Sequence, residues 1–303
     1  AIYSEEDKYD FRDGAAAAVC FSYAWRDTGD AAWRRRAIAA RAYALKGQPV
    51  KDPANRNQYG AFSHMVEGGF VGAPRYLRLT DKLPRAVGVE TCIAINHLTR
   101  TIELGLEPGD EDLHRLELAA GWLVANEFLP GSFRHTEGYT NDIQPCNALG
   151  AMALVRAYDT LEKLGRHPPR SWLDAAQRGM RHYLEGQEAI GCWPYVFATI
   201  GRGQAFTEEI IPPQGIGLYH FMVACGTPAF RNQPGVRDKM QRAARWFLCM
   251  SHIERRGPIP TIDLDDRRAT GNLKFSAFTW NRFTAAASLL RIAEYTGQSE
   301  PWR

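Results

Sequence analysis

The chain has 303 residues, of which 45% are hydrophobic and 23% are charged, and its formal net charge is only +3. This composition is typical of a globular protein that can bury a sizeable core. The sequence has no basic stripe with interleaved aromatic residues, so we expect no nucleic acid as a partner. It also has no apolar run long enough to span a bilayer, so we expect no membrane span.

The six cysteines are scattered, without a CxxC pair or the ligand spacing of a metal site. Most lie among apolar residues in helical patterns, where a free thiol behaves as a small hydrophobic group. We therefore expect no metal and no cofactor. The cysteine usage favours a cytoplasmic over a periplasmic location, and no signal peptide is recognised. The sequence leaves the oligomeric state open.

Apolar residues that recur every three or four positions predict helices, and clusters of Gly, Pro, Asn and Asp separate them. Paired in order, the predicted helices make four hairpins and the first helix of a fifth. The first helix of each pair is rich in small apolar residues, whereas the second carries a charged face, as a helix facing water does. The predicted helices span residues 11–27, 31–47, 88–105, 110–128, 146–164, 171–187, 214–226, 234–252 and 276–296.

Two of these hairpins follow the same plan, because their second helices run from Trp33 to Gln48 and from Trp172 to Gln187. Tandem hairpins of this size cannot bury their apolar faces alone and must stack on one another. The sequence therefore predicts a single all-α domain over residues 1–303. We expect an α/α toroid (barrel) of about five to six hairpins, with long loops over one mouth. The partner of the last helix is missing from the pattern, so either the ring is incomplete or the chain continues. A linear solenoid is the alternative, although unequal repeats and long loops argue against it.

A short motif supports this architecture. Residues 183–193 read YLEGQEAIGCW and match the pattern aromatic-Leu-x-x-Gln-x-x-x-Gly-x-Trp. The segment resembles the repeat of squalene and terpenoid cyclases, and it is similar to segments of toroidal polysaccharide lyases. In those families the Gln ties the end of one helix to the next turn and the Trp packs below it. The resemblance therefore implies an α/α-toroid fold without specifying the chemistry.

Two further resemblances concern chemistry. Residues 263–266 spell the DxDD motif of class II terpene cyclases, in which the middle residue, here Asp265, would protonate an alkene. Arg267 and Arg268 follow at once and favour ionised carboxylates, as in a solvated acidic turn. Residues 144–147, followed by a helix that reaches Asp159, resemble part of linalool dehydratase. That resemblance carries over Cys146 alone.

The candidate site residues come mainly from the loops that enter the first helix of each hairpin. In a toroid these loops and the helix N-termini, which favour anions, form one mouth of the cavity. A lyase acting on uronic acids needs groups that neutralise the carboxylate, a base for the adjacent proton and an acid for the leaving oxygen. The loop over residues 134–144 contains all these residue types. The candidate catalytic residues are His97, His135, Tyr139, Cys146, Glu208 and His220; the candidate substrate-binding residues are Arg134, Asn141, Asp142, Gln144, Trp193, Tyr195, Gln214, Trp280 and Asn281.

Structural roles remain open for several of these residues. His97 has the surroundings of a satisfied core histidine, Cys146 those of a small buried residue, and Trp193 those of a packing residue. The leading prediction is a carbon–oxygen lyase that acts by elimination on a uronic-acid-containing saccharide in a central cleft. The alternatives are a terpenoid cyclase or dehydratase-isomerase using acid catalysis in an apolar pocket, a glycoside hydrolase, and a non-catalytic helical-repeat binder. The partner is in each case a small molecule or an oligosaccharide.

Overall fold

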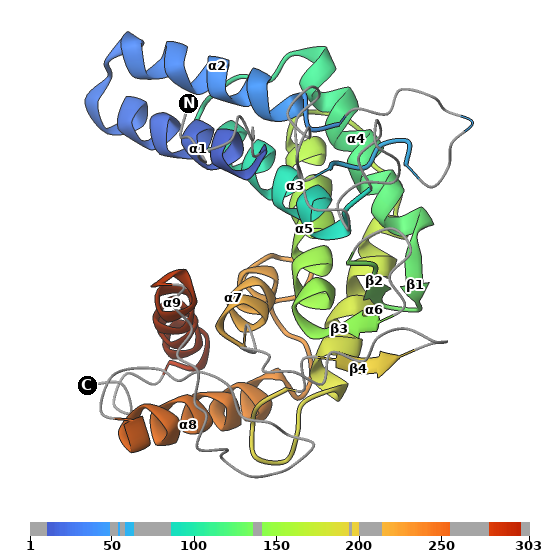
Figure 1. The fold of residues 1–303 in the computed structure, drawn as a ribbon, viewed down its shortest axis with the longest axis vertical. Helices are drawn as coiled ribbons and strands as arrows, with labels where there is room; N and C mark the ends of the chain where they lie inside the picture. The colour runs from blue at the N-terminus through green and yellow to red at the C-terminus, as the bar shows by residue number, and fades with distance from the viewer. Residues whose placement is uncertain are drawn as a thin grey trace, which may run out of the picture. The chain divides into compact units, whose positions relative to one another are not determined.

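The computed structural model describes residues 11–48, 54, 58–63, 86–135, 141–193, 196–199, 214–254 and 279–297. Most of the regular structure in these ranges is helical, as the periodicity of the sequence predicts (Figure 1). Each helix lies within a few residues of a predicted one. The helices are α1 (Phe11–Thr28), α2 (Ala31–Leu45), α3 (Gly88–Glu103), α4 (Asp110–Ala125), α5 (Gln144–Lys163), α6 (Ser171–Glu185), α7 (Gln214–Cys225), α8 (Val236–Glu254) and α9 (Thr279–Thr296).

The described residues also contain four short strands that the sequence did not predict. They are β1 (Glu127–Leu129), β2 (Ser132–Phe133), β3 (Asn141–Ile143) and β4 (Val196–Thr199). β1 pairs with β2, and β3 pairs antiparallel with β4, so that Asp142 lies opposite Ala198. Strands this short offer too few positions for an alternating pattern to be recognised.

The chain divides into two compact units. The first contains residues 1–127, 133–139 and 153–175, and the second contains residues 128–132, 140–152 and 176–303. Helix α5 therefore begins in the second unit and ends in the first.

In the first unit, a buried arginine connects α2 to the segment that follows α3. The Arg41 guanidinium donates to the carbonyl oxygens of Leu106 (3.1 Å) and Glu107 (2.8 Å). It also forms an ion pair with Asp112 at 2.9 Å. Burial lowers the pKa of Arg41, Asp112 opposes that change, and the neighbouring Arg34 adds to it. These bonds give the buried guanidinium the partners it needs.

The loop after each of three even-numbered helices contains a glycine with positive φ that packs on the backbone of the next even-numbered helix. The φ angles are +94° at Gly60, +87° at Gly131 and +101° at Gly191. A Cβ atom would lie 2.4 Å from the Leu118 carbonyl oxygen of α4 at Gly60 and 2.4 Å from the Arg242 carbonyl oxygen of α8 at Gly191. At Gly131, it would lie 2.5 Å from the Arg178 carbonyl oxygen of α6. Only glycine fits these positions without strain.

A buried aromatic ring follows each of these glycines by two residues: Phe62, Phe133 and Trp193. The sequence motif Gly-x-Trp is therefore one case of Gly-x-aromatic, and the three segments read GAF, GSF and GCW. We call the glycine, the aromatic residue and the backbone on which the glycine packs a hairpin joint.

In two of the three hairpin joints, a glutamine side-chain amide donates hydrogen bonds to two backbone carbonyl oxygens. The Gln187 side-chain amide donates to the carbonyl oxygens of Gly191 (3.0 Å) and Lys239 (2.8 Å). In the first unit the Gln48 amide donates in the same way to Gly60 (2.6 Å) and Arg115 (3.4 Å). The role that the toroid resemblance assigns to the glutamine is thus confirmed, because each one ties the end of a helix to the following turn.

Candidate functional site

Several predicted site residues lie outside the described part of the chain. Tyr139, Tyr195 and Glu208 are among them, as is the whole DxDD tetrad. For four others the structure describes the backbone, in β3, α7 or α9, but not the side chain: Asn141, Gln214, Trp280 and Asn281. The roles proposed for these residues remain predictions.

For two candidate site residues, burial favours the structural role that the sequence left open. The Trp193 indole is buried, donates to the Tyr183 carbonyl oxygen at 2.7 Å and stacks on the Tyr183 ring with centroids 4.7 Å apart. It therefore packs the core and offers no face to a saccharide. Cys146 is also buried, and burial followed by the charge of Asp142 raises its thiol pKa far above the usual range. The thiol stays protonated, which argues against a nucleophilic role.

Asp142 and Gln144 were predicted to bind substrate, but the structure places both in the interior of the second unit. The Gln144 amide packs against Gly217, where an added Cβ would lie 2.1 Å from the Gln144 Nε2 atom. Neither side chain has surface accessible to a ligand. Their contribution is to the packing around the start of α5.

The predicted loop at residues 134–135 lies against the N-terminus of α3. The His135 carbonyl oxygen accepts hydrogen bonds from the backbone N–H groups of Gly88 (2.8 Å) and Val89 (3.4 Å). A Cβ at Gly88 would lie only 1.7 Å from the Arg134 carbonyl oxygen, which explains the glycine. This loop therefore satisfies backbone donors that a helix start leaves open.

The two other candidate histidines belong to different units. His220 lies half-buried on α7 of the second unit, with its ring in edge contact with Tyr219. His97 on α3 faces a small hollow of the first unit lined mainly by apolar side chains such as Ala15, Phe62 and Leu98. Its Nδ1 atom is buried and has no hydrogen-bond partner among the described residues. Burial and then Arg156 lower the pKa of His97 to about 4, against the opposing effect of Glu90, so the ring is neutral at neutral pH.

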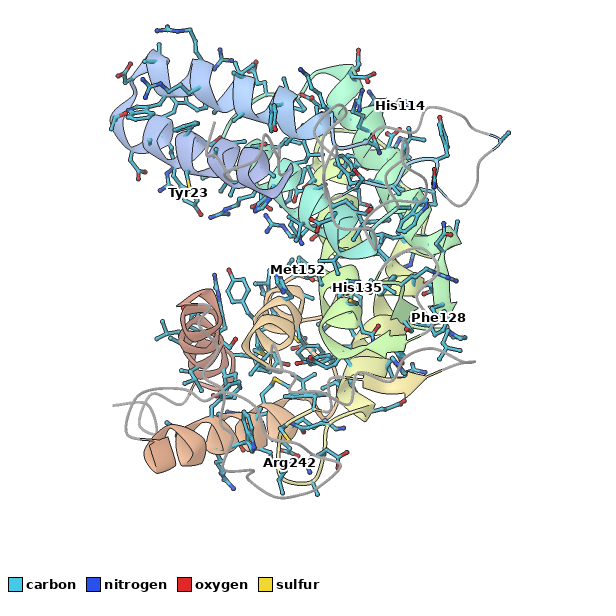
Figure 2. All side chains as sticks on the ribbon, in the orientation of Figure 1. Tyr23, His114, Phe128, His135, Met152 and Arg242 are labelled. Carbon is cyan, nitrogen blue, oxygen red and sulfur yellow. The ribbon has the colours of Figure 1, made fainter. Side chains whose placement is uncertain are left out.

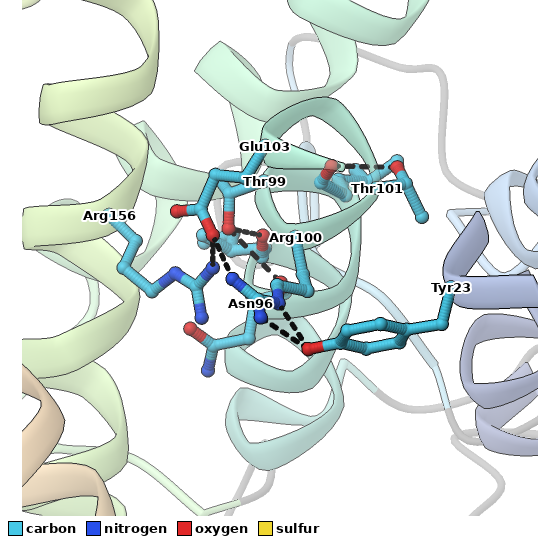
Figure 3. Close-up of polar contacts among 9 residues, drawn as sticks. Tyr23, Asn96, Thr99, Arg100, Thr101, Glu103 and Arg156 are labelled. Carbon is cyan, nitrogen blue, oxygen red and sulfur yellow. Dashed lines mark hydrogen bonds and ion pairs between the residues drawn. The ribbon is translucent and has the colours of Figure 1, made fainter. Parts of the chain in front are cut away.

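A polar cluster on α1, α3 and α5 is the strongest candidate for a ligand site (Figure 3). We call it the arginine cluster and define it as Tyr23, Asn96, Arg100, Glu103 and Arg156. Tyr23 projects from α1 (Figure 2), and its hydroxyl oxygen accepts two hydrogen bonds from Arg100, one of them at 3.0 Å. Asn96, Arg100 and Glu103 share one face of α3 because they are spaced by four and three residues.

A single carboxylate holds both guanidinium groups of the arginine cluster. Glu103 Oε2 accepts from Arg100 at 2.9 Å and from Arg156 at 2.6 Å. Burial lowers the pKa of Arg100, but its hydrogen bonds to Tyr23 and Glu103 outweigh that effect and raise it overall. Two permanent positive charges thus face one negative charge, and this excess favours an anionic ligand.

The arginine cluster also contains polar atoms that lack partners. Both amide atoms of Asn96 and the Nε atom of Arg156 are buried, and none has a hydrogen-bond partner among the described residues. Leaving such groups unpaired costs roughly 1–3 kcal/mol each, so their presence needs an explanation. A ligand that accepts hydrogen bonds from Asn96 Nδ2 and Arg156 Nε would supply one for these two donors.

Asp159 lies one turn after Arg156 on α5, at the edge of the arginine cluster. Its pKa is raised, first by burial and then by the nearby charges of Glu162 and Glu103, while Lys163 opposes the shift. A carboxyl group with a raised pKa is a better candidate for a general acid than one with the ordinary pKa.

Asp142 and His182 form a second polar arrangement, in the second unit. The His182 Nε2 and Asp142 Oδ2 atoms lie 2.5 Å apart. His182 was not among the predicted site residues, because it lies on the charged helix of its hairpin, forty positions from its partner.

The described residues include no group of three or more His, Cys, Asp or Glu side chains placed to hold a metal ion. Within the same part of the chain, no helix is both long enough and apolar enough to cross a bilayer.

No family model matches the chain, and no curated protein sequence matches it significantly. Solved structures do match. A D-mannose isomerase superimposes with a TM-score of 0.65 at 11% identity, over 95% of this chain and 70% of that one. The chain has the α/α-toroid fold. The fold class expected from the hairpin pattern is therefore confirmed, whereas the extent of the domain remains a prediction.

Two other toroid enzymes match over most of their length. The unsaturated glucuronyl hydrolase of Bacillus sp. GL1, responsible for the degradation of glycosaminoglycan, gives a TM-score of 0.54 at 15% identity, over 100% of this chain and 92% of that one. A possible member of the GH105 family from Salmonella enterica subsp. enterica serovar Paratyphi A gives 0.51 at 14% identity, over 95% and 84%. At these identities the similarity shows the fold alone. None of these three proteins is a terpenoid cyclase or a linalool dehydratase.

Proposed function

We propose that this protein is a carbohydrate-processing enzyme whose substrate carries a carboxylate, as in a uronic acid. The observation that carries the proposal is the arginine cluster, with its excess positive charge and the unpartnered atoms of Asn96 and Arg156. A carboxylate is planar and accepts several hydrogen bonds, which matches an amide and a guanidinium side by side. The structures with a similar fold include a glucuronyl hydrolase, which supports a saccharide substrate.

The reaction that we propose is elimination. Arg156 and Asn96 bind the carboxylate and stabilise the negative charge that develops when the adjacent carbon loses its proton. A base takes that proton, the bond to the neighbouring glycosidic oxygen breaks, and the leaving oxygen is protonated. Tyr23 is the candidate for proton transfer, because Arg100 donates two hydrogen bonds to its oxygen and stabilises charge that develops there.

Glycoside hydrolysis is the second candidate, and Asp159 favours it. The raised pKa of Asp159 favours donation of a proton to a leaving oxygen, and the Glu103 carboxylate lies between two arginines. An acid and an ionised carboxylate are the two groups that glycoside hydrolysis requires. In this alternative the arginine cluster still binds the uronate.

A product assay separates these reactions. The purified protein is incubated with uronate-containing oligosaccharides, and both the reducing ends and the ultraviolet absorbance of unsaturated uronate are followed. Elimination produces both signals, hydrolysis of a saturated chain produces reducing ends alone, and hydrolysis of an unsaturated chain removes absorbance. If no uronate-containing substrate is turned over or bound, the proposal is wrong.

A matched ligand pair tests the carboxylate directly. Reducing the uronate carboxyl to an alcohol changes its charge but little of its shape. We expect the reduced oligosaccharide to bind at least roughly tenfold more weakly, because one charge-assisted hydrogen bond is lost. Arg156→Gln should remove this preference. Arg166→Gln, at an exposed arginine paired with Asp110, should leave it unchanged.

A further inference from the structure

The carboxylate of Asp142 is held by three side chains in the interior of the second unit. Ser132 Oγ donates to Asp142 Oδ1 at 2.6 Å and Asn147 Nδ2 donates to the same atom at 2.9 Å. His182 Nε2 lies 2.5 Å from the other oxygen, Oδ2. The Asp142 side chain is 0% exposed, whereas that of His182 is 28% exposed. Solvent protons can therefore reach the pair through the histidine.

His182 is the member of this network that can change its charge near neutral pH. Ser132 on β2 and Asn147 on α5 are neutral donors, and the buried Cys146 thiol on α5 stays protonated. Asp142 on β3 and Glu185 on its own helix are charged groups that act on His182. The hydrogen bond to Asp142 raises the pKa of His182, burial opposes it, and the charges of Asp142 and Glu185 add to it.

Asp142 itself remains ionised. Burial alone raises its pKa, but the hydrogen bonds from His182, Ser132 and Asn147 outweigh that effect and lower the pKa overall. A buried carboxylate that loses its positive partner is strongly destabilised, because the remaining neutral donors do not cancel its charge. The protonation state of His182 therefore decides how firmly Asp142 is held.

The bond between these residues joins separate elements of the second unit. Asp142 lies in β3, where it is paired with Ala198 of β4, and it lies two residues before the start of α5 at Gln144. His182 lies in the last turn of α6. The ion pair thus connects the β3–β4 pair and the start of α5 to the end of α6.

We propose that Asp142 and His182 form a proton-operated latch that holds β3 and the first turn of α5 against the last turn of α6. The latch is closed while His182 carries its proton. It weakens when that proton passes to solvent, because a neutral imidazole then faces a buried carboxylate.

The sign of the effect follows from the two directions of shift. His182 has a raised pKa, so its contribution is complete below the ordinary value of 6.5 and is lost as the pH rises through the raised value. Asp142 has a lowered pKa, so its contribution is complete above 3.8 and is lost as the pH falls through the lowered value. The latch is fully closed between these two ordinary values.

Hydrogen–deuterium exchange of the intact protein tests the latch. Backbone amides of the non-proline residues in 141–147 should exchange roughly tenfold faster, after correction for the intrinsic rate, once the pH exceeds the raised pKa of His182. The amides of α2, in the first unit, serve as the internal reference and should not follow this change. A wild-type protein without such a pH step would overturn the proposal.

Variants test whether the pH step in amide exchange depends on the pair of Asp142 and His182. His182→Gln keeps a neutral hydrogen-bond donor but cannot take up a proton, so its exchange at residues 141–147 should not depend on pH after correction. His114→Gln, at an exposed histidine of α4, should retain the wild-type step. The ring resonances of His182 in the wild-type protein, identified by their absence in His182→Gln, give a second measurement of the midpoint. A midpoint at or below 6.5, or a step that persists in His182→Gln, contradicts the latch.

Discussion

Gly191 lies so close to Arg242 that a Cβ atom on the glycine would be 2.4 Å from the Arg242 carbonyl oxygen. The φ angle of Gly191 is +101°, a region that L-residues avoid. Two independent penalties therefore act on any side chain at this position. The same combination occurs at Gly60 and Gly131, so it belongs to the hairpin joint rather than to one loop.

Gly191→Ala should destabilise the protein by about 2–5 kcal/mol, of which roughly 1–2 kcal/mol is backbone strain and the rest is steric overlap. Gly165→Ala is the matched control, because Gly165 has a φ of +74° but no atom within 4 Å of an added Cβ. It should show the strain alone. Urea denaturation of both variants measures the difference, and equal losses would contradict the steric argument.

Arg41→Leu should cost about 3–5 kcal/mol of unfolding free energy. The change leaves Asp112 and the carbonyl oxygens of Leu106 and Glu107 without their buried partner. Arg166→Leu removes an arginine whose partner, Asp110, is 98% exposed, and it should cost no more than about 1 kcal/mol. Thermal denaturation of the two variants compares a buried with an exposed ion pair, and similar midpoints would show that burial does not matter here.

Asn96→Leu should stabilise the fold and weaken ligand binding. It removes an amide that is buried without a partner, which should raise the unfolding free energy by about 1 kcal/mol. The same change removes a proposed contact to the carboxylate, so the affinity for a uronate ligand should fall roughly tenfold. Denaturation and equilibrium binding measure the two effects. A variant that loses stability would show that Asn96 has a partner in the folded protein.

His97 should titrate with a midpoint of about 4 when its ring resonances are followed by NMR. Because its folded pKa is lowered, the protein should lose stability as the pH falls from 6.5 towards 4, by up to about 3 kcal/mol. His97→Gln identifies the resonance and should remove this part of the acid sensitivity. A midpoint close to 6.5 would mean that the ring is solvated.

The helices were predictable from sequence because long amphipathic patterns repeat the same spacing many times. The arginine cluster was not predicted from the sequence. The candidate site residues predicted from the sequence lie mainly in loops, whereas Tyr23, Arg100 and Arg156 lie on helices. The spacing of Asn96, Arg100 and Glu103 by four and three residues could have indicated a polar face on a helix predicted to be buried.

Other features could not be read from sequence for physical reasons. The bond between Asp142 and His182 depends on a contact between residues far apart in the chain, and no local pattern encodes it. Burial decided the outcome for Trp193 and Cys146, whose residue types suit either a core or a site. The repeated glycine was hidden because Phe62 and Phe133 replace the tryptophan of the motif.

The hairpin joints also bear on the order in which parts of the protein unfold. Each joint fastens one hairpin to its successor through short-range contacts, so a defect at Gly60 should loosen the contact with α4 before it is felt elsewhere. Proteins whose repeats contact mainly their neighbours unfold in stages instead of in one cooperative transition. Proteolytic fragments of a joint variant should therefore end near the altered turn, and their boundaries would map the order in which the modules separate.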